Sequence, residues 1–262
     1  MLTYPNIDPV ALDLGFVQIR WYGISYVVGI LLAWWLLKIR ARQPERGFSQ
    51  QQVGDLVFYC MVGIIIGGRL GSVLFYYPEY YLQHPLEIFY LQQGGMAFHG
   101  GLLGVIVAVW LYARKQQQSF FVVSDFIAPV VPVGLFCGRI ANFINAELWG
   151  APSTLPWAMV FPDPAAGGIA RHPSQLYEAL LEGLLLFVLL WWYSSRPRTR
   201  ATVSGLFLLL YGLFRFLVEF VREPDAHIGY LAFDWFTMGQ ALSLPMIVLG
   251  LLIIVISRRK SQ

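Results

Sequence analysis

The chain has 262 residues, of which 57% are hydrophobic, 16% aromatic and only 13% charged. This composition exceeds what a soluble core of that size requires and is typical of a multi-spanning membrane protein. The formal net charge is +3, and the basic residues gather beside apolar stretches. We therefore interpret the charge as a signal of membrane orientation rather than as a nucleic-acid patch.

Seven apolar stretches follow one another, each near the roughly 20 residues that cross a bilayer as a helix. They lie at 20–38, 56–77, 97–113, 121–143, 175–193, 204–221 and 239–257. Pro129 and Pro132 interrupt the fourth stretch, so we expect a kink, either beside an internal cavity or for packing alone. The sequence predicts an all-α integral membrane protein with seven transmembrane helices, forming a single polytopic membrane domain over residues 1–262.

The basic residues predict the orientation of these helices, because cytoplasmic loops carry an excess of Lys and Arg. They follow the first, third, fifth and seventh stretches, at Lys38, Arg40, Arg42, Arg46, Arg114, Lys115, Arg196, Arg198, Arg200, Arg258, Arg259 and Lys260. This pattern predicts an extracytoplasmic N-terminus and a cytoplasmic C-terminus. Residues 151–174 are rich in Pro and Gly and are expected to form an extracytoplasmic loop or arm, which either covers an entrance or only connects two helices.

With this orientation, polar side chains from several helices share one level near the outer leaflet. They are Tyr22, Arg69, His99, Arg139, Asn142, His172, Gln175, Glu178, Glu182, Tyr211, Arg215, Glu219 and Arg222. Because polar groups are costly in lipid, their clustering predicts a water-accessible or headgroup-accessible cavity between helices. Arginine is favoured for contact with a phosphate, since its guanidinium binds phosphate oxygens bidentately.

Structural roles compete with functional ones at these positions. Arg215, Glu219 and Arg222 share one helix face and can form an ion-pair ladder. Glu178 and Glu182 are favoured as counter-ions for Arg69, Arg139 or Arg215 over a role as general bases.

His99 and Cys137 also have two possible roles each. His99 either exchanges a proton during a reaction or only forms hydrogen bonds at the membrane interface. Cys60 and Cys137 fall at different depths, so a disulfide between them is not expected. Cys137 is better explained as a packed small side chain than as a covalent intermediate, and neither cysteine is assigned to the site.

The densest polar run lies at 138–150 and reads Gly-Arg-Ile-Ala-Asn-Phe-Ile-Asn-Ala-Glu-Leu-Trp-Gly. It resembles the signature of the bacterial prolipoprotein diacylglyceryl transferases. Further blocks appear in the order of that family: RWYG at 20–23, GGRLG at 67–71, GGMAFHGGLLG at 94–104, RHPSQLYE at 171–178 and YGLFRFLVEFVREPD at 211–225. Ala141 and Ala146 depart from the family pattern, since many relatives carry glycine there.

The resemblance implies transfer of the diacylglyceryl group of phosphatidylglycerol to the lipobox cysteine thiol in the signal peptide of a prolipoprotein, with release of glycerol phosphate. It implies a location in the bacterial cytoplasmic (inner) membrane, with the active site towards the outer leaflet, and no cofactor, metal or nucleic acid. The implied catalytic residues are His99, Arg139, Arg215, Tyr22 and Tyr211, and the implied substrate-binding residues are Arg139, Asn142, Asn145, Glu147, Gly150, Glu219, Arg222 and Arg69. The acceptor of the thiol proton stays open.

Two other classes of protein compete with this interpretation. A lipid flippase or transporter could also use arginines between helices, but no second half of the chain repeats the first. An intramembrane protease would need a nucleophile and a base, for which Ser72 with His99 is the only pair suggested.

Overall fold

The computed structural model describes residues 2–15, 17–90, 94–224 and 229–259; Asp225 and Lys260, named or quoted above, lie outside them. The chain divides into two compact units. Unit 1 consists of Met1–Leu36 and Ile127–Gln262, and unit 2 consists of Leu37–Phe126. The expectation of a single polytopic domain, with 151–174 as an extracytoplasmic arm, stays a prediction.

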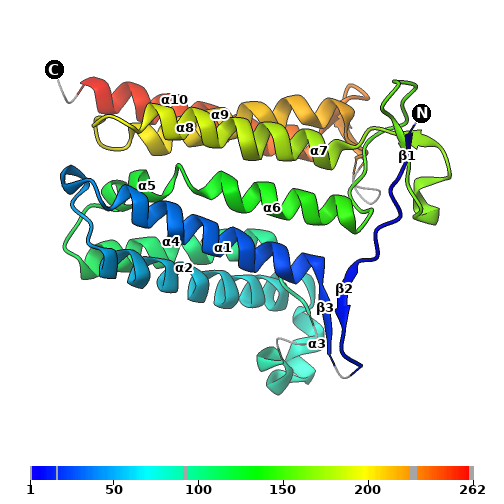
Figure 1. Ribbon diagram of the computed structural model, residues 1–262, viewed down its shortest axis with the longest axis horizontal. Coiled ribbons are helices and arrows are strands. Elements are labelled where there is room, and N and C mark those ends of the chain that lie inside the picture. The colour runs from blue at the N-terminus through cyan, green and yellow to red at the C-terminus, as the bar shows by residue number, and fades with distance from the viewer. Residues whose placement is uncertain (1, 16, 91–93, 225–228, 260–262) are drawn as a thin grey trace. The chain divides into compact units, whose positions relative to one another are not determined.

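Helices make up most of the described chain (Figure 1). They are α1 (Trp21–Arg40), α2 (Gln50–Gly71), α3 (Pro78–Gln83), α4 (Phe98–Lys115), α5 (Phe120–Ile127), α6 (Val131–Ile144), α7 (Ser174–Glu178), α8 (Leu186–Tyr193), α9 (Thr202–Val218) and α10 (Met238–Arg259). A π-helical segment, Ser72–Tyr76, continues α2, and another, Ala179–Leu185, joins α7 to α8. Short 3-10 turns lie at Pro44–Arg46, Pro85–Phe89, Pro164–Ala166 and Glu219–Val221.

Five helical segments of the described chain are long and apolar enough to cross a membrane. They are Trp21–Arg40, Gln50–Tyr76, Ser174–Tyr193, Thr202–Val221 and Met238–Arg259. Helices α5 and α6 add a sixth if they form one broken span. The expected interruption is confirmed, because Pro129 lies between these helices and Pro132 in the first turn of α6.

The stretch expected at 97–113 is also helical, as α4, but it is not among these membrane-crossing candidates. Its 18 residues include His99, Arg114 and Lys115, which lower its mean hydropathy. The structure therefore supports a mostly helical, multi-pass membrane protein. The number of seven spans and their orientation stay predictions.

Short strands precede the first helix and also lie between later helices, and an all-α prediction does not include them. Strand β4 (Met159–Val160) pairs in parallel with β1 (Leu2–Thr3) and antiparallel with β5 (Ala170–Arg171). Two further antiparallel pairs are β2 (Val10–Asp13) with β3 (Gln18–Arg20) and β6 (Tyr230–Ala232) with β7 (Phe236–Thr237). These pairs satisfy backbone groups in segments that have no helical hydrogen bonds.

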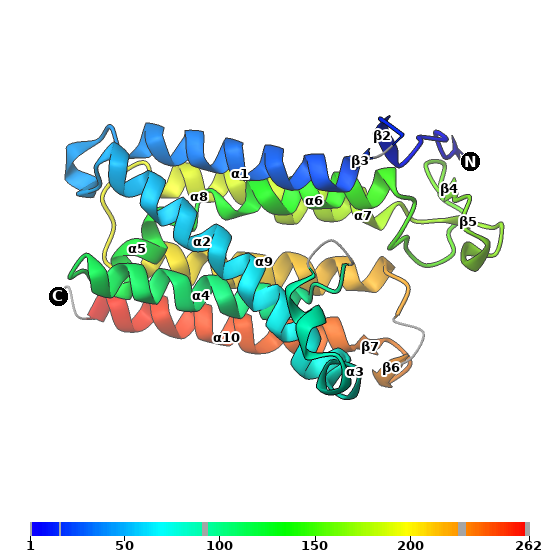
Figure 2. The ribbon, with the colours of Figure 1, turned by 90° about the horizontal axis from the view of Figure 1, so that it is seen from below.

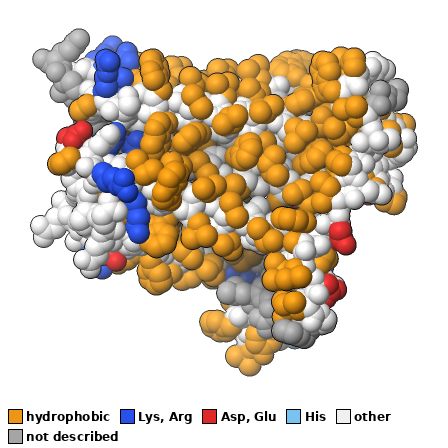
Figure 3. Space-filling view, in the orientation of Figure 1, with side chains coloured by type: hydrophobic (Ala, Val, Ile, Leu, Met, Phe, Trp, Pro, Cys, Tyr) orange, Lys and Arg blue, Asp and Glu red, His pale blue; other side chains and the backbone are white. Residues whose placement is uncertain are grey.

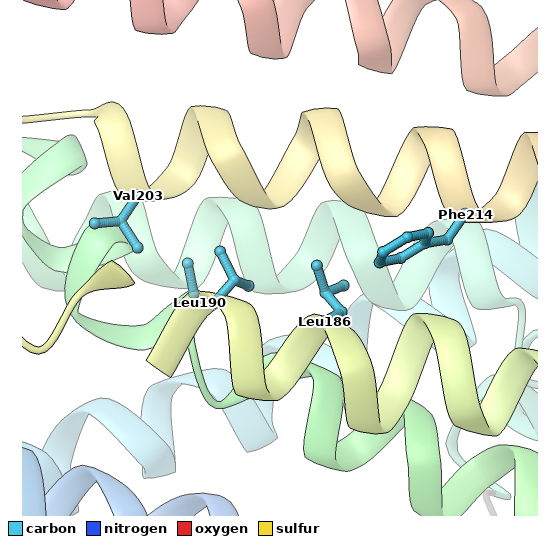
Figure 4. Packing of buried hydrophobic residues seen from close by; sticks show 5 residues of the cluster. Leu186, Leu190, Val203 and Phe214 are labelled. Carbon is cyan, nitrogen blue, oxygen red and sulfur yellow. The ribbon is translucent and has the colours of Figure 1, made fainter. Parts of the chain in front are cut away.

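In unit 1, α8 and α10 lie on either side of α9 (Figures 1 and 2). Leu186 and Leu190 of α8 pack against Val203 and Phe214 of α9 (Figure 4). These side chains are all less than a tenth exposed, so together with Ala128 they form a core that fixes α9 beside the helix carrying Glu178.

A second small core of unit 1 holds the end of α6. Tyr4 packs with Ala146, Phe161 and Ala166, and its hydroxyl donates to the carbonyls of Phe143 and Ile144 at 2.7 and 2.8 Å. Both carbonyls belong to the last turn of α6, and that of Phe143 also accepts from the Ala146 N–H at 2.9 Å. The N-terminal segment thereby adds a donor to the end of α6 and ties the 151–174 region to the 138–150 run.

Unit 2 is organised by close packing of α2 against α4. A Cβ added at Gly67 would lie 2.7 Å from the Cα of Gly104, and one added at Gly63 would lie 2.9 Å from the Cβ of Ala108. Small residues repeated every four positions let two helix backbones approach this closely, as in other membrane helix pairs. Outward-facing side chains of the helices are largely hydrophobic, as the visible face in Figure 3 shows.

Candidate active site

Six charged side chains of unit 1 form one cluster, which we call the Arg–Glu cluster. Its members are Arg139 on α6, Glu178 on α7, Glu182 on the following π-helical segment, Arg215 on α9, and Glu219 and Arg222 just beyond α9. Three guanidinium groups thus face three carboxylates. The predicted role of Glu178 and Glu182 as counter-ions is confirmed for Arg139 and Arg215.

Glu178 is the centre of the cluster, because all three arginines contact its carboxylate. Its Oε2 lies 2.6 Å from Arg139 Nε and 3.3 Å from Arg215 Nη1, and its Oε1 lies 2.9 Å from Arg222 Nη1. One turn further along the helix, Glu182 makes longer contacts, 3.5 Å to Arg139 Nη2 and 3.7 Å to Arg215 Nη1. Glu178 therefore brings Arg139 and Arg215 to a single point.

The expected ladder along one helix face is also confirmed. Arg215 Nη2 donates to Glu219 Oε1 at 2.5 Å, and Arg222 Nε lies 3.4 Å from the same oxygen. These pairs are four and three residues apart, as the helical repeat requires.

The two signs of charge differ in exposure. The side chains of Glu178 and Glu182 are 1% and 0% exposed, whereas those of Arg139, Arg215 and Arg222 keep 19%, 16% and 11% of their surface accessible. Among the described residues, the carboxylates engage Arg139 through Nε and Nη2 and leave Nη1 for another contact. The cluster thus buries its anions and presents part of its cations, an arrangement that suits an anionic ligand.

The 138–150 run closes on itself at the end of α6. Asn142 Nδ2 and Asn145 Nδ2 donate to Glu147 Oε1 at 2.8 and 3.3 Å, and Gln175 Nε2 donates to the Glu147 carbonyl at 2.6 Å. Ala146 and Leu148 have positive φ angles of 54° and 57°, in the left-handed region. The tight turn explains why polar side chains so close in sequence meet at one carboxylate.

Gly150 lies where three segments meet. Its N–H donates to the His172 carbonyl at 2.8 Å, and it pairs as an isolated bridge with Arg222. A Cβ added there would contact the Val221 carbonyl and would lie 2.8 Å from the His172 Cβ, so this position requires glycine. Burial lowers the pKa of His172, which keeps its imidazole neutral near pH 7. Gly150 therefore joins the 138–150 run to Arg222, the last residue of the ion-pair ladder.

Arg171, which was not assigned to the site, anchors the 151–174 region. Its guanidinium donates to the Ala166 and Gly150 carbonyls and to Glu223, and it stacks 4.4 Å from the Trp149 ring centroid. These contacts occupy the Arg171 guanidinium in holding the 151–174 region against Gly150 and Trp149.

The two tyrosines assigned to catalysis belong to unit 1. The Tyr22 hydroxyl lies 3.4 Å from that of Tyr26 and within electrostatic range of Arg139 and Glu147. Tyr211 stacks on Phe207 and lies within electrostatic range of Glu182, Arg215, Arg139 and Glu178. Both phenols therefore belong to the surroundings of the cluster.

Arg69 and His99 belong to unit 2. His99 is exposed in the first turn of α4. Arg69 is buried, and its guanidinium donates to the backbone carbonyls of Ile88 and Gly94 at 2.8 and 2.5 Å and also to that of Glu87. These bonds give Arg69 a structural task within its own unit, and its assignment to substrate binding stays a prediction.

Three residues beside the cluster were missed by the sequence analysis. Thr237 Oγ1 donates to Glu219 Oε2 at 2.9 Å, and Gln240 exchanges hydrogen bonds with Thr237. Gly239 packs against the Glu219 carboxylate. The signal that could have found them is the Thr-x-x-Gln pattern that caps the last apolar stretch.

No group of three or more His, Cys, Asp or Glu that could hold a metal ion occurs in the described part of the chain. Fold and site together define a multi-pass helical membrane protein with an Arg–Glu cluster whose arginines are partly exposed. A family model described as prolipoprotein diacylglyceryl transferase matches residues 9–256, so the chain belongs to this family.

Relatives named phosphatidylglycerol–prolipoprotein diacylglyceryl transferase match nearly the whole chain. The protein from Nitratidesulfovibrio vulgaris (strain DSM 19637 / Miyazaki F) is 57% identical over 262 residues, covering 100% of this chain and 98% of the relative. The protein from Coxiella burnetii (strain RSA 331 / Henzerling II) is 56% identical over 250 residues, covering 95% of each chain. The protein from Oleidesulfovibrio alaskensis is 57% identical over 254 residues, covering 97% of this chain and 94% of the relative.

Proposed function

We propose that the chain transfers the diacylglyceryl group of phosphatidylglycerol to the lipobox cysteine thiol of prolipoproteins, releasing glycerol phosphate, as a step in bacterial lipoprotein maturation. The observation that carries the proposal is the meeting of Arg139 and Arg215 at the buried Glu178 carboxylate, with both guanidinium groups partly exposed. Membership in the family supports the same activity.

The reaction forms one bond and breaks another. The sulfur of the substrate cysteine attacks the glycerol carbon that carries the phosphate ester, a C–S bond forms, and the C–O bond to phosphate breaks. The leaving glycerol phosphate keeps the electron pair and gains a second negative charge. Arg139 and Arg215 stabilise this charge with preorganised N–H donors, because Glu178 already holds both groups in place.

The remaining residues are proposed in supporting roles. Catalytic roles are also proposed for His99, Tyr22 and Tyr211, with His99 as a candidate acceptor for the thiol proton. The proposed substrate-binding residues are Arg69, Arg139, Asn142, Asn145, Glu147, Gly150, Glu219 and Arg222. The scheme uses no cofactor, since the nucleophile comes from the peptide and the electrophile from the lipid.

We also propose the setting of the reaction. Seven transmembrane helices cross the bacterial inner membrane, with the N-terminus extracytoplasmic and the C-terminus cytoplasmic. The active site then faces the outer leaflet, where it meets phosphatidylglycerol and the signal peptide of a prolipoprotein, and residues 151–174 form an arm on that side. The run of basic residues at the ends of α1, α4 and α10 supports this orientation.

The direct test mixes the purified protein with phosphatidylglycerol and a lipobox peptide and follows peptide mass and released glycerol phosphate. We expect the peptide to gain the mass of a diacylglyceryl group, and a peptide with Cys→Ser in the lipobox to gain none. Folded protein that binds the lipid but leaves the peptide unchanged would contradict the proposal and favour lipid transport.

A further inference from the structure

The Glu219 carboxylate is held from two sides. Its Oε1 faces the arginines, at 2.5 Å from Arg215 Nη2 and 3.4 Å from Arg222 Nε. Its Oε2 accepts a hydrogen bond from Thr237 Oγ1 at 2.9 Å. Both Glu219 and Thr237 are buried, at 5% and 3% exposure, so water does not replace this donor easily. Glu219 Oε1 therefore contacts the arginines of the cluster, while Oε2 accepts the hydrogen bond from the Thr237 hydroxyl.

The cap of α10 sets the direction of that hydroxyl. The backbone N–H of Gln240 donates to Thr237 Oγ1 at 3.2 Å, and Gln240 Oε1 accepts from the backbone N–H of Thr237 at 3.0 Å. This reciprocal pair is a capping box at the start of a 22-residue helix. Because Oγ1 already accepts from Gln240, its single proton is free to point at Glu219.

The carboxylate is also confined sterically. Gly239, the second residue of α10, packs so closely that a Cβ added there would collide with Glu219 Oε1 and lie 2.9 Å from its Cγ. Glu219 thus has a hydroxyl, a glycine backbone and two arginines as its described neighbours, and these together hold its carboxylate in place.

We propose that Thr237 is a positioning residue for the transfer reaction. Its hydroxyl, oriented by the cap of α10, fixes the Glu219 carboxylate so that Glu219 holds Arg215 through one oxygen only. The inference rests on the proposed function and adds a residue at the start of α10 to the site. Thr237 acts through Glu219 and makes no contact with substrate.

The consequence concerns the transition state more than substrate binding. Without the hydroxyl, Glu219 Oε2 is a buried acceptor with no partner, and the carboxylate turns towards the guanidinium groups to recover a donor. Arg215 then offers fewer N–H groups to the leaving phosphate. Because these donors matter most as charge develops, kcat falls while the KM for phosphatidylglycerol changes little.

The test compares Thr237→Val, Thr237→Ser and the unsubstituted protein in the peptide-transfer assay, with thermal stability measured in detergent. Thr202→Val is the matched control, since the Thr202 hydroxyl is equally buried but donates to the Thr199 carbonyl at the far end of α9. We expect Thr237→Val to lower kcat about tenfold with less than a twofold change in KM, a loss of about 1.4 kcal/mol. Thr237→Ser restores kcat, and Thr202→Val retains it.

Each result decides between the two proposals. If the unsubstituted protein transfers nothing, the proposed function itself fails. If it transfers, and Thr237→Val keeps full kcat or loses stability alone, the positioning role is overturned. Gly239→Ala is the second variant, needed if Thr237→Val does not fold: its methyl group displaces the Glu219 carboxylate and leaves the capping box in place, so an unchanged kcat there also overturns the inference.

Discussion

At the residue scale, the central feature of the site is the Glu178 carboxylate, which contacts three arginines. Three cations cannot be packed together near lipid unless anions lie among them, and Glu178 supplies that anion with 1% of its side chain exposed. The partly exposed guanidinium groups are therefore held rigidly before any ligand arrives. A preorganised cation stabilises developing charge better than a mobile one.

This arrangement predicts the effect of removing either arginine. We expect Arg139→Ala and Arg215→Ala each to lower peptide transfer by about 100-fold or more, because each removes donors that we propose stabilise the leaving phosphate. Each also leaves a buried carboxylate short of a partner, which costs about 3–5 kcal/mol in stability. Activity is therefore measured per amount of membrane-inserted, folded protein.

Cys137→Ser is the control for that experiment. Cys137 lies on the same helix as Arg139, beside Gly29 of α1, and is a free thiol. Since the proposed nucleophile comes from the peptide, this variant keeps its activity. A folded but inactive Cys137→Ser protein would point instead to a covalent enzyme intermediate.

The residues that sequence reasoning reached differ physically from those it missed. The ladder of Arg215, Glu219 and Arg222 follows from spacing along one helix, so it could be predicted. Thr237 reaches Glu219 across 18 residues, and no local rule pairs them. The carbonyls that bind Arg69 are likewise 18 to 26 residues away, in a segment with no periodicity to place it.

At the element scale, small residues decide how closely α2 and α4 approach. Gly67 and Gly104 face each other with no room for a side chain, whereas Gly54 on the same α2 helix has nothing within 4 Å of an added Cβ. The GGRLG and HGGLLG blocks quoted for the family resemblance are therefore explained, at these glycines, by helix packing.

Alanine substitutions separate the two kinds of glycine. We expect Gly67→Ala to destabilise the protein by about 1–3 kcal/mol, because the added methyl group forces α2 and α4 apart. Gly54→Ala carries the same change into open space and should leave stability unchanged or raise it by up to about 1 kcal/mol, since Ala favours a helix over Gly. Thermal unfolding in detergent measures both, and equal losses would show that packing is not the cause.

The helices themselves were easier to predict than their interruptions. Apolar length identified all the long segments, and the prolines located the break between α5 and α6. The short strands and the π-helical segment Ala179–Leu185 could not be anticipated, because two- to four-residue pairings and an extra residue per turn leave no clear periodicity. That π-helical segment carries Glu182.

At the scale of the whole molecule, orientation is the property on which the proposed site depends. Basic residues end α1, α4 and α10, and we expect these ends to lie in the cytoplasm. Reporter fusions at the C-terminus and within residues 151–174 test this. A cytoplasmic signal from the first and an extracytoplasmic signal from the second are expected, and the reverse pattern would move the site to the inner leaflet.

Unit 1 also has a consequence for how the chain is made. Tyr4 binds the carbonyl of Phe143, 139 residues later, and Gly29 of α1 meets Gly134 of α6. A ribosome adding about 5–20 residues per second needs roughly 7 to 28 s to cover that distance. During this time the first segment lacks its contacts with α6, so assembly of this part of unit 1 is a late event in biogenesis and is sensitive to any delay in translation.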